Sequence, residues 1–134
     1  MSGMMSMLLS VTLTTTSVLA LIYIVLSARV IQGRLKYRVS LGHGGNDDLE
    51  NRVRSHANFS EYVPLLLILM GLLELGGANK TALAYGGALL VVCRILHPIG
   101  IPRRVPNAFR FIGTVGTFSL LIAGSVYGLV LTLG

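Results

Sequence analysis

The chain has 134 residues, of which 53% are hydrophobic and only 12% are charged, and its formal net charge is +6. A soluble domain carries roughly a quarter charged residues, so this composition, with a mean hydropathy of +0.75, excludes a soluble globular domain. The single cysteine, Cys93, excludes an intrachain disulfide. Any chemistry must therefore lie in or beside a bilayer.

Four apolar segments follow one another along the chain, at about residues 4–28, 58–78, 81–100 and 111–133. Short separate segments can satisfy their backbone hydrogen bonds in lipid only as helices. The first segment lies in a stretch, residues 1–28, that lacks any charged side chain and so lacks the positive region of a secretory signal. The sequence predicts an all-α integral membrane protein, with one domain over residues 1–134 and a bundle of four transmembrane helices.

A glycine-rich and Asx-rich patch at residues 41–48 predicts a loop between the first two spans. Asp47 or Asp48 is predicted to cap a helix that starts at Leu49 and continues into the second span. Pro64 is predicted to bend this helix without ending it.

The cations are distributed very unevenly, since ten of the eleven basic residues flank the first and third connections and only Lys80 belongs to the other side. Lysine and arginine near span ends stay on the cytoplasmic side and attract anionic lipid headgroups. Both basic loops should therefore face the cytoplasm, with both termini on the opposite side. The flanking residues are Arg29, Arg34, Lys36, Arg38, Arg52, Arg54, Arg94, Arg103, Arg104 and Arg110.

Three polar residues, Arg54, Asn58 and Glu61, lie at positions i, i+4 and i+7 and so share one helical stripe as the chain enters the second span. Ionisable groups at membrane depth usually face a partner or a wet cavity. Glu61 therefore indicates either a polar pocket or an ion pair, with Arg54 or Arg94, that only holds helices together.

Arg94 and His97 form an i, i+3 pair near the end of the third span, and Arg110 lies at the start of the fourth. In a compact bundle these residues converge with Arg54 into a pocket that holds three guanidinium groups. Such a pocket suits an anionic ligand, because guanidinium binds carboxylates bidentately. Nearby positive charge would also lower the pKa of a ligand thiol from about 8.5.

The remaining polar residues carry simpler interpretations. Glu74 lies 13 residues after Glu61, about 20 Å along a helix, so the two cannot share one site, and Lys80 is available near Glu74. The histidines outside the pocket, His43 and His56, are interpreted as a solvated and a packing residue. No histidine is clustered with carboxylates, so no metal site is expected, and no basic and aromatic alternation indicates a nucleic-acid partner.

Residues 54–64, Arg-Ser-His-Ala-Asn-Phe-Ser-Glu-Tyr-Val-Pro, resemble the signature Arg-(Ala/Ser)-x-x-Asn-x-x-Glu-x-x-Pro of the MAPEG family, the membrane-associated proteins in eicosanoid and glutathione metabolism. The length, the four spans and the basic first loop fit as well, and the sequence looks similar to the small bacterial members. The resemblance implies a homotrimer of four-helix subunits that binds glutathione between adjacent subunits near the cytoplasmic face.

By this resemblance Arg110 is the catalytic residue, which stabilises the glutathione thiolate. Ile101 and Thr114 stand where family members have tyrosines, which removes two ligand contacts. The residues expected to hold glutathione are Arg29, Arg54, Asn58, Glu61, Tyr62, Arg94 and His97.

The resemblance thus implies a membrane-embedded glutathione transferase that conjugates glutathione to lipophilic electrophiles in a bacterial inner membrane. Glutathione would be the co-substrate, and no metal is expected. Glutathione peroxidase activity is a further option. Two alternatives stay open. One is a small proton-coupled multidrug exporter, and the other is a glutathione-binding protein of the same fold without catalysis.

Overall fold

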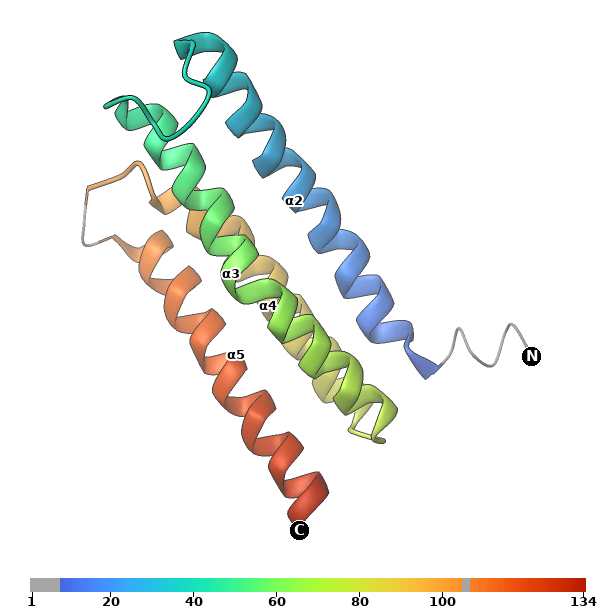
Figure 1. The fold of residues 1–134 in the computed structure, drawn as a ribbon. Coiled ribbons are helices and arrows are strands. Elements are labelled where there is room, and N and C mark those ends of the chain that lie inside the picture. The colour runs from blue at the N-terminus through green and yellow to red at the C-terminus, as the bar shows by residue number, and fades with distance from the viewer. Residues whose placement is uncertain (1–7, 105–106) are drawn as a thin grey trace.

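The computed structural model describes residues 8–104 and 107–134, and these residues form four long helices (Figure 1). Each of the four is long and apolar enough to cross a membrane, which confirms the predicted all-α fold with four candidate spans. The helices are α2 (Ser10–Tyr37), α3 (Asp47–Leu75), α4 (Lys80–Gly100) and α5 (Ala108–Leu133).

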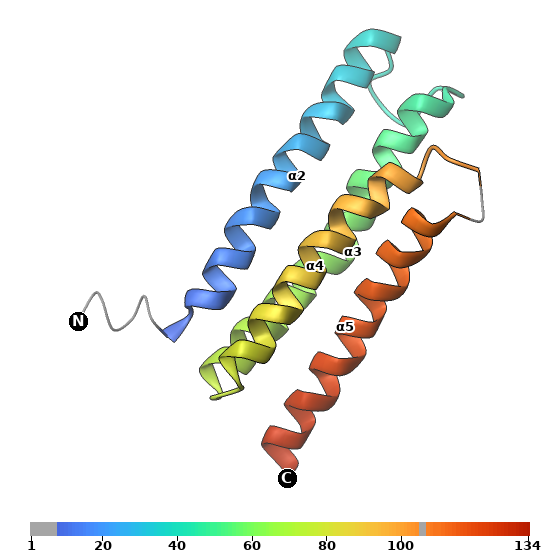
Figure 2. The same ribbon diagram turned by 180° about the vertical axis from the view of Figure 1, so that it is seen from behind.

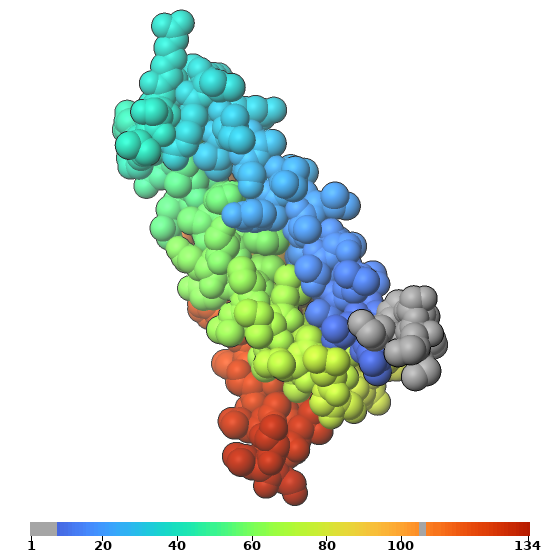
Figure 3. Space-filling view, turned by 45° about the vertical axis from the view of Figure 1, so that its right-hand side comes forward, coloured from blue at the N-terminus to red at the C-terminus, as the bar shows by residue number. Residues whose placement is uncertain are grey.

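The helices run side by side and alternate in direction, so that the start of α2 and the end of α5 lie at the same end of the bundle (Figures 1 and 2). The basic connections, between α2 and α3 and between α4 and α5, lie together at the other end. Both views place α2 and α5 on opposite sides of the pair α3 and α4. The result is an elongated molecule, with α2 lying along the side of α3 (Figure 3).

Two helices extend beyond the apolar segments that predicted them. Helix α2 continues nine residues past residue 28 and ends at Tyr37, and the next residue, Arg38, has a left-handed φ of 55°. The predicted start of the first span, at residue 4, lies outside the described residues. Helix α3 begins at Asp47, eleven residues before the apolar segment, and its first turns are polar. This agrees with the expectation that a helix near Leu49 continues into the second span.

The cap of α3 differs from the prediction. Asn46 is the capping residue, and its Oδ1 accepts a hydrogen bond of 2.9 Å from the backbone N–H of Leu49. Asp47 and Asp48 instead lie in the first turn of the helix, where carboxylates interact favourably with the positive end of the helix dipole. The side chain of asparagine fits the capping geometry as well as that of aspartate, so composition alone did not distinguish the three positions.

Apolar side chains fill the interior and also cover the outside. Outward-facing residues such as Leu21, Leu65 and Leu129 are exposed, as expected of helices that face lipid. The main interior cluster, from α2, α3 and α4, consists of Leu19, Leu26, Phe59, Val63, Leu66 and Leu90. A second cluster, close to the α3–α4 connection, consists of Met70, Leu73, Ala78 and Leu83.

Glycines bring α5 close to its neighbours. A Cβ atom on Gly124 would lie 2.9 Å from Leu69 Cδ2, and one on Gly128 would lie 3.8 Å from Leu73 Cδ2. The Gly-x-x-x-Gly pattern of α5 therefore packs against α3 within the same subunit, in the way small residues allow membrane helices to approach.

Candidate functional site

Arg94 is the centre of a polar cluster between α3 and α4. Its side chain is fully buried, and its Nη1 donates a hydrogen bond of 2.8 Å to Asn58 Oδ1. The guanidinium carbon also lies 5.5 Å from the centre of the Phe59 ring. Within the described residues, Nε and Nη2 of Arg94 have no hydrogen-bond partner. A buried cation with two unused donors is the arrangement expected of a site that receives an anion.

His97 lies one turn after Arg94 and belongs to the same cluster. Its ring is buried, and Nδ1 has no hydrogen-bond partner in the part of the chain that the structure describes. Arg94 and His97 are thus two buried polar side chains on adjacent turns of α4.

The helix period explains why Arg94 and His97 face inward. Gly87, Leu90, Arg94 and His97 recur every three or four residues, and all four are buried on one face of α4. At the level of His97 the helix α5 comes very close, since a Cβ atom on Gly113 would lie 2.7 Å from His97 Cβ. The close approach encloses the cluster on the α5 side.

The other predicted residues on α3 are oriented differently. Arg54 and Glu61 are exposed, and within the described ranges no ion pair joins Glu61 to Arg54 or Arg94. The ion pair that was one of the two interpretations of Glu61 is therefore not formed within the described residues of a single subunit. Tyr62 is half-buried, with its ring edge-on to Phe118 of α5 at a centroid distance of 5.2 Å.

The two outermost candidates lie on α2 and α5. Arg29 is half-buried, and its backbone carbonyl accepts a hydrogen bond of 2.9 Å from Arg52 Nη1. Arg110 is exposed in the first turn of α5, which Asn107 caps through a bond of 2.9 Å to the Arg110 N–H. The structure therefore brings Asn58, Arg94 and His97 together, whereas the side chains of Arg29, Arg54, Glu61 and Arg110 are exposed or half-exposed.

Sequence reasoning missed one participant, Phe59, whose ring lies beside the Arg94 guanidinium and 5.3 Å from the ring of Tyr23. The only available signal was its position next to Asn58. The predicted packing role of His56 agrees with the structure, because its ring stacks on Tyr23 at 4.8 Å and Nε2 lies 3.1 Å from Ser27 Oγ.

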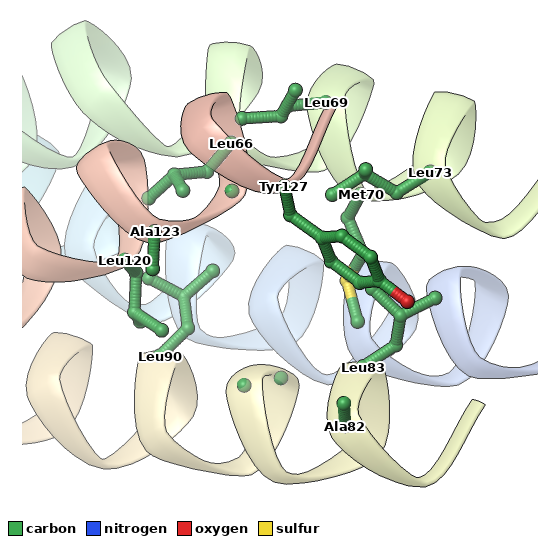
Figure 4. A pocket seen from close by; sticks show the side chains of 13 residues that line it. Leu66, Leu69, Met70, Leu73, Ala82, Leu83, Leu90, Leu120, Ala123 and Tyr127 are labelled. Atoms are coloured by element: carbon green, nitrogen blue, oxygen red, sulfur yellow. The ribbon is translucent and has the colours of Figure 1, made fainter. Parts of the chain in front are cut away.

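An apolar cavity of about 210 Å³ lies among α3, α4 and α5 (Figure 4). Leu90, on its wall, lies one helical turn before Arg94 along α4. Its one polar side chain, Tyr127, already accepts a hydrogen bond of 2.8 Å from the Asn79 N–H. The lining residues are Leu66, Leu69, Met70, Leu73, Ala82, Leu83, Gly86, Gly87, Leu90, Leu120, Ala123, Gly124 and Tyr127.

Metal ligands do not gather in this region. Over residues 8–104 and 107–134, no group of three or more His, Cys, Asp or Glu side chains could hold a metal ion. The polar groups of this cluster are a guanidinium, an imidazole and an amide, and groups of this kind are able to hydrogen-bond an anion.

Four membrane-length helices with a buried arginine and histidine near one end define a small integral membrane protein with a candidate anion site. The sequence model of the MAPEG family matches residues 12–130, and the chain belongs to this family. Membrane glutathione transferases are among the members of the family, and glutathione is a common ligand of its members.

Relatives in two strains of Escherichia coli, K12 and O6:H1 (CFT073), are both called inner membrane protein YecN. Each is 34% identical to this chain over 86 residues, which is 64% of the chain and 66% of the relative. The match thus spans slightly less than two thirds of the length of these relatives. The relationship supports membrane residence, and the name YecN states a location without a reaction.

Proposed function

We propose that this protein is a membrane-embedded glutathione transferase, which conjugates the glutathione thiolate to lipophilic electrophiles, with glutathione peroxidase activity as a further option. The observation that carries the proposal is Arg94, a fully buried cation with two donors that lack partners among the described residues. Glutathione is a tripeptide with two carboxylates, and family membership supports it as the anion.

The charges around the cluster match the charges of glutathione. In this proposal Arg94, Arg54 and Arg29 bind the carboxylates, since arginine holds carboxylates through paired hydrogen bonds. Glu61, which is exposed on the same face of α3, binds the ammonium group. Asn58 and His97 orient the tripeptide, and Tyr62 contributes to the wall.

The chemical step needs an ionised thiol. Arg110 stabilises the thiolate, because a neighbouring positive charge favours the charged form of a thiol. The thiolate sulfur then attacks the electrophilic atom of the co-substrate, a carbon–sulfur bond forms, and the leaving group departs with its electron pair. Holding both reactants side by side supplies much of the acceleration.

The apolar cavity supports a lipophilic co-substrate. Its wall includes Leu90, which lies one turn before Arg94 along α4, and its lining is almost entirely aliphatic. A compound dissolved in the bilayer could enter such a space without losing hydrogen bonds to water.

The assembly and orientation are parts of the same proposal. Several candidate residues, Arg29, Arg54, Glu61 and Arg110, keep exposed or half-exposed side chains in the single subunit, and a neighbouring subunit of a homotrimer would complete their surroundings. The end of the bundle that carries the basic connections would face the cytoplasm, in line with the positive-inside rule.

The test is calorimetry with glutathione on the detergent-purified protein, followed by activity towards a generic aryl halide. Arg110→Ala is expected to lower the rate at least about tenfold, because it removes the charge next to the thiolate, while the oligomer stays intact by native mass spectrometry. Arg104→Ala, which removes an exposed arginine of the neighbouring connection, is the matched control and should leave the rate unchanged.

One outcome tests the catalytic role of Arg110, and two others separate the candidate functions. An unchanged rate in Arg110→Ala would remove the catalytic role of this residue. Binding of glutathione without turnover would favour the non-catalytic protein of the same fold. Proton-coupled cation flux in liposomes, without glutathione binding, would favour the exporter. An excess of arginine around Glu61 would oppose that function, because like charges repel cationic drugs.

A further inference from the structure

Glu74, in the last turn of α3, is a buried carboxylate that the proposed reaction does not use. Its exposed fraction is only 5%. Oε1 accepts a hydrogen bond of 3.0 Å from the N–H of Val11, and Oε2 accepts bonds of 2.8 and 2.6 Å from the N–H and hydroxyl of Thr12. Lys80 Nζ lies 3.8 Å from Oε1. The carboxylate thus joins the end of α3 to the start of α2.

These bonds serve as a cap for the start of α2. The first N–H groups of a helix have no partners within the helix and normally bond to a capping side chain. In α2 the capping position is Leu9, which makes no side-chain bond, and the first turn contains no acidic residue. The carboxylate of Glu74 supplies both acceptors for the N–H groups of Val11 and Thr12 and the negative charge that favours a helix N-terminus.

The contact between Glu74 and α2 matters for the placement of α2, because this helix lies at the edge of the bundle. Helix α2 lies at the edge of the bundle, on the far side of α3 and α4 from α5 (Figures 1 and 2). In lipid, apolar packing between helices lacks the hydrophobic driving force that it has in water. Directional polar contacts therefore contribute, together with close packing, to how one helix is placed along another.

Such contacts occur at both ends of α2. Near the basic end, Arg52 Nη1 donates to the carbonyl of Arg29 at 2.9 Å, and Tyr37 donates to Asp48 Oδ2 at 2.8 Å. At the opposite end the corresponding contact is made by Glu74. A slide of α2 by one residue moves it about 1.5 Å, which is enough to break all three bonds to this carboxylate.

We propose that Glu74 is a latch, a capping residue supplied by another helix that holds the start of α2 against α3 and fixes its register in the bundle. A carboxylate buried in a membrane protein is costly, and the three donors of α2 offset this cost. The latch belongs to the fold of the chain and does not depend on the proposed transferase activity.

The experiment is residue-resolved hydrogen–deuterium exchange on the full chain in lipid nanodiscs. Glu74→Gln keeps one carbonyl oxygen and loses the other acceptor, so exchange at the amides of Val11 and Thr12 is expected to rise about tenfold. Amides in the middle of α5 should keep their rates within about twofold. Lys80→Gln is the matched control, because it removes the neighbouring charge and leaves the three bonds in place, and it should change the rates by less than about threefold.

Two results would overturn the proposal that Glu74 caps α2 and fixes its register. One is exchange at Val11 and Thr12 that stays within twofold of the wild type in Glu74→Gln, and the other is equal acceleration in α5, which would mean that Glu74 stabilises the whole bundle. If Glu74→Gln does not fold, Thr12→Val provides the test. It removes only the hydroxyl donor and should raise exchange at these two amides about threefold, and wild-type rates in that variant would also overturn the proposal.

Discussion

Asn58→Asp changes one atom of the side chain that holds Arg94 and separates the stability of the free protein from its affinity for an anion. Asn58 Oδ1 accepts the 2.8 Å hydrogen bond from Arg94 Nη1. Aspartate keeps an acceptor at this position and adds a negative charge beside a fully buried guanidinium. The substitution therefore converts a hydrogen bond into an ion pair at nearly constant volume.

The two expected effects differ in size. The attraction between the introduced carboxylate and Arg94 is largely offset by the cost of burying the new charge, so the free energy of unfolding should change by less than about 1 kcal/mol. A ligand anion on the unused side of the guanidinium would lie roughly 6 Å from the new carboxylate. At an effective dielectric constant near 20, two like charges at that distance repel by about 2.8 kcal/mol, which lowers affinity about a hundredfold.

The assay combines thermal unfolding in detergent with calorimetric titration of glutathione. The expected result is a melting temperature close to that of the wild type together with a large loss of glutathione affinity. Asn58→Ala is the comparison, because it leaves the buried guanidinium without an acceptor and should destabilise the free protein by about 2 kcal/mol. Glutathione affinity that is unchanged in Asn58→Asp would refute the assignment of Arg94 as an anion-binding residue.

Two further predictions concern the packing of the bundle. Gly113→Ala places a methyl group 2.7 Å from His97 Cβ and 3.0 Å from the Cys93 carbonyl oxygen, so α4 and α5 must separate. The free energy of unfolding in detergent should fall by about 1–3 kcal/mol. Wild-type stability would mean that α5 can move away from α4 without cost. Tyr127→Phe removes the acceptor of the 2.8 Å bond from the Asn79 N–H, and the same measurement should show a loss of about 1 kcal/mol, with glutathione affinity unchanged. A drop in affinity there would contradict the separation of this end of the bundle from the anion site.

The candidate site shows where prediction from sequence succeeded and where it failed. The helix period placed Arg54, Asn58 and Glu61 on one stripe, and the structure has all three residues within helix α3. It did not show which part of the stripe faces α4. The structure turns Asn58 towards Arg94 and leaves Arg54 and Glu61 exposed, because the rotation of α3 about its axis is set by packing against its neighbours.

Composition and hydropathy along the chain were sufficient for four membrane-length helices, because the thickness of the bilayer sets the length of an apolar span and lipid requires each span to be a helix. The local motif was sufficient for the family. Only the tertiary structure decided that Arg94 meets Asn58, 36 residues away, and that Glu74 caps α2 at Thr12, 62 residues away. Contacts of this kind depend on which helices lie side by side and in which rotation, and the pattern of residues within a single helix does not carry that information.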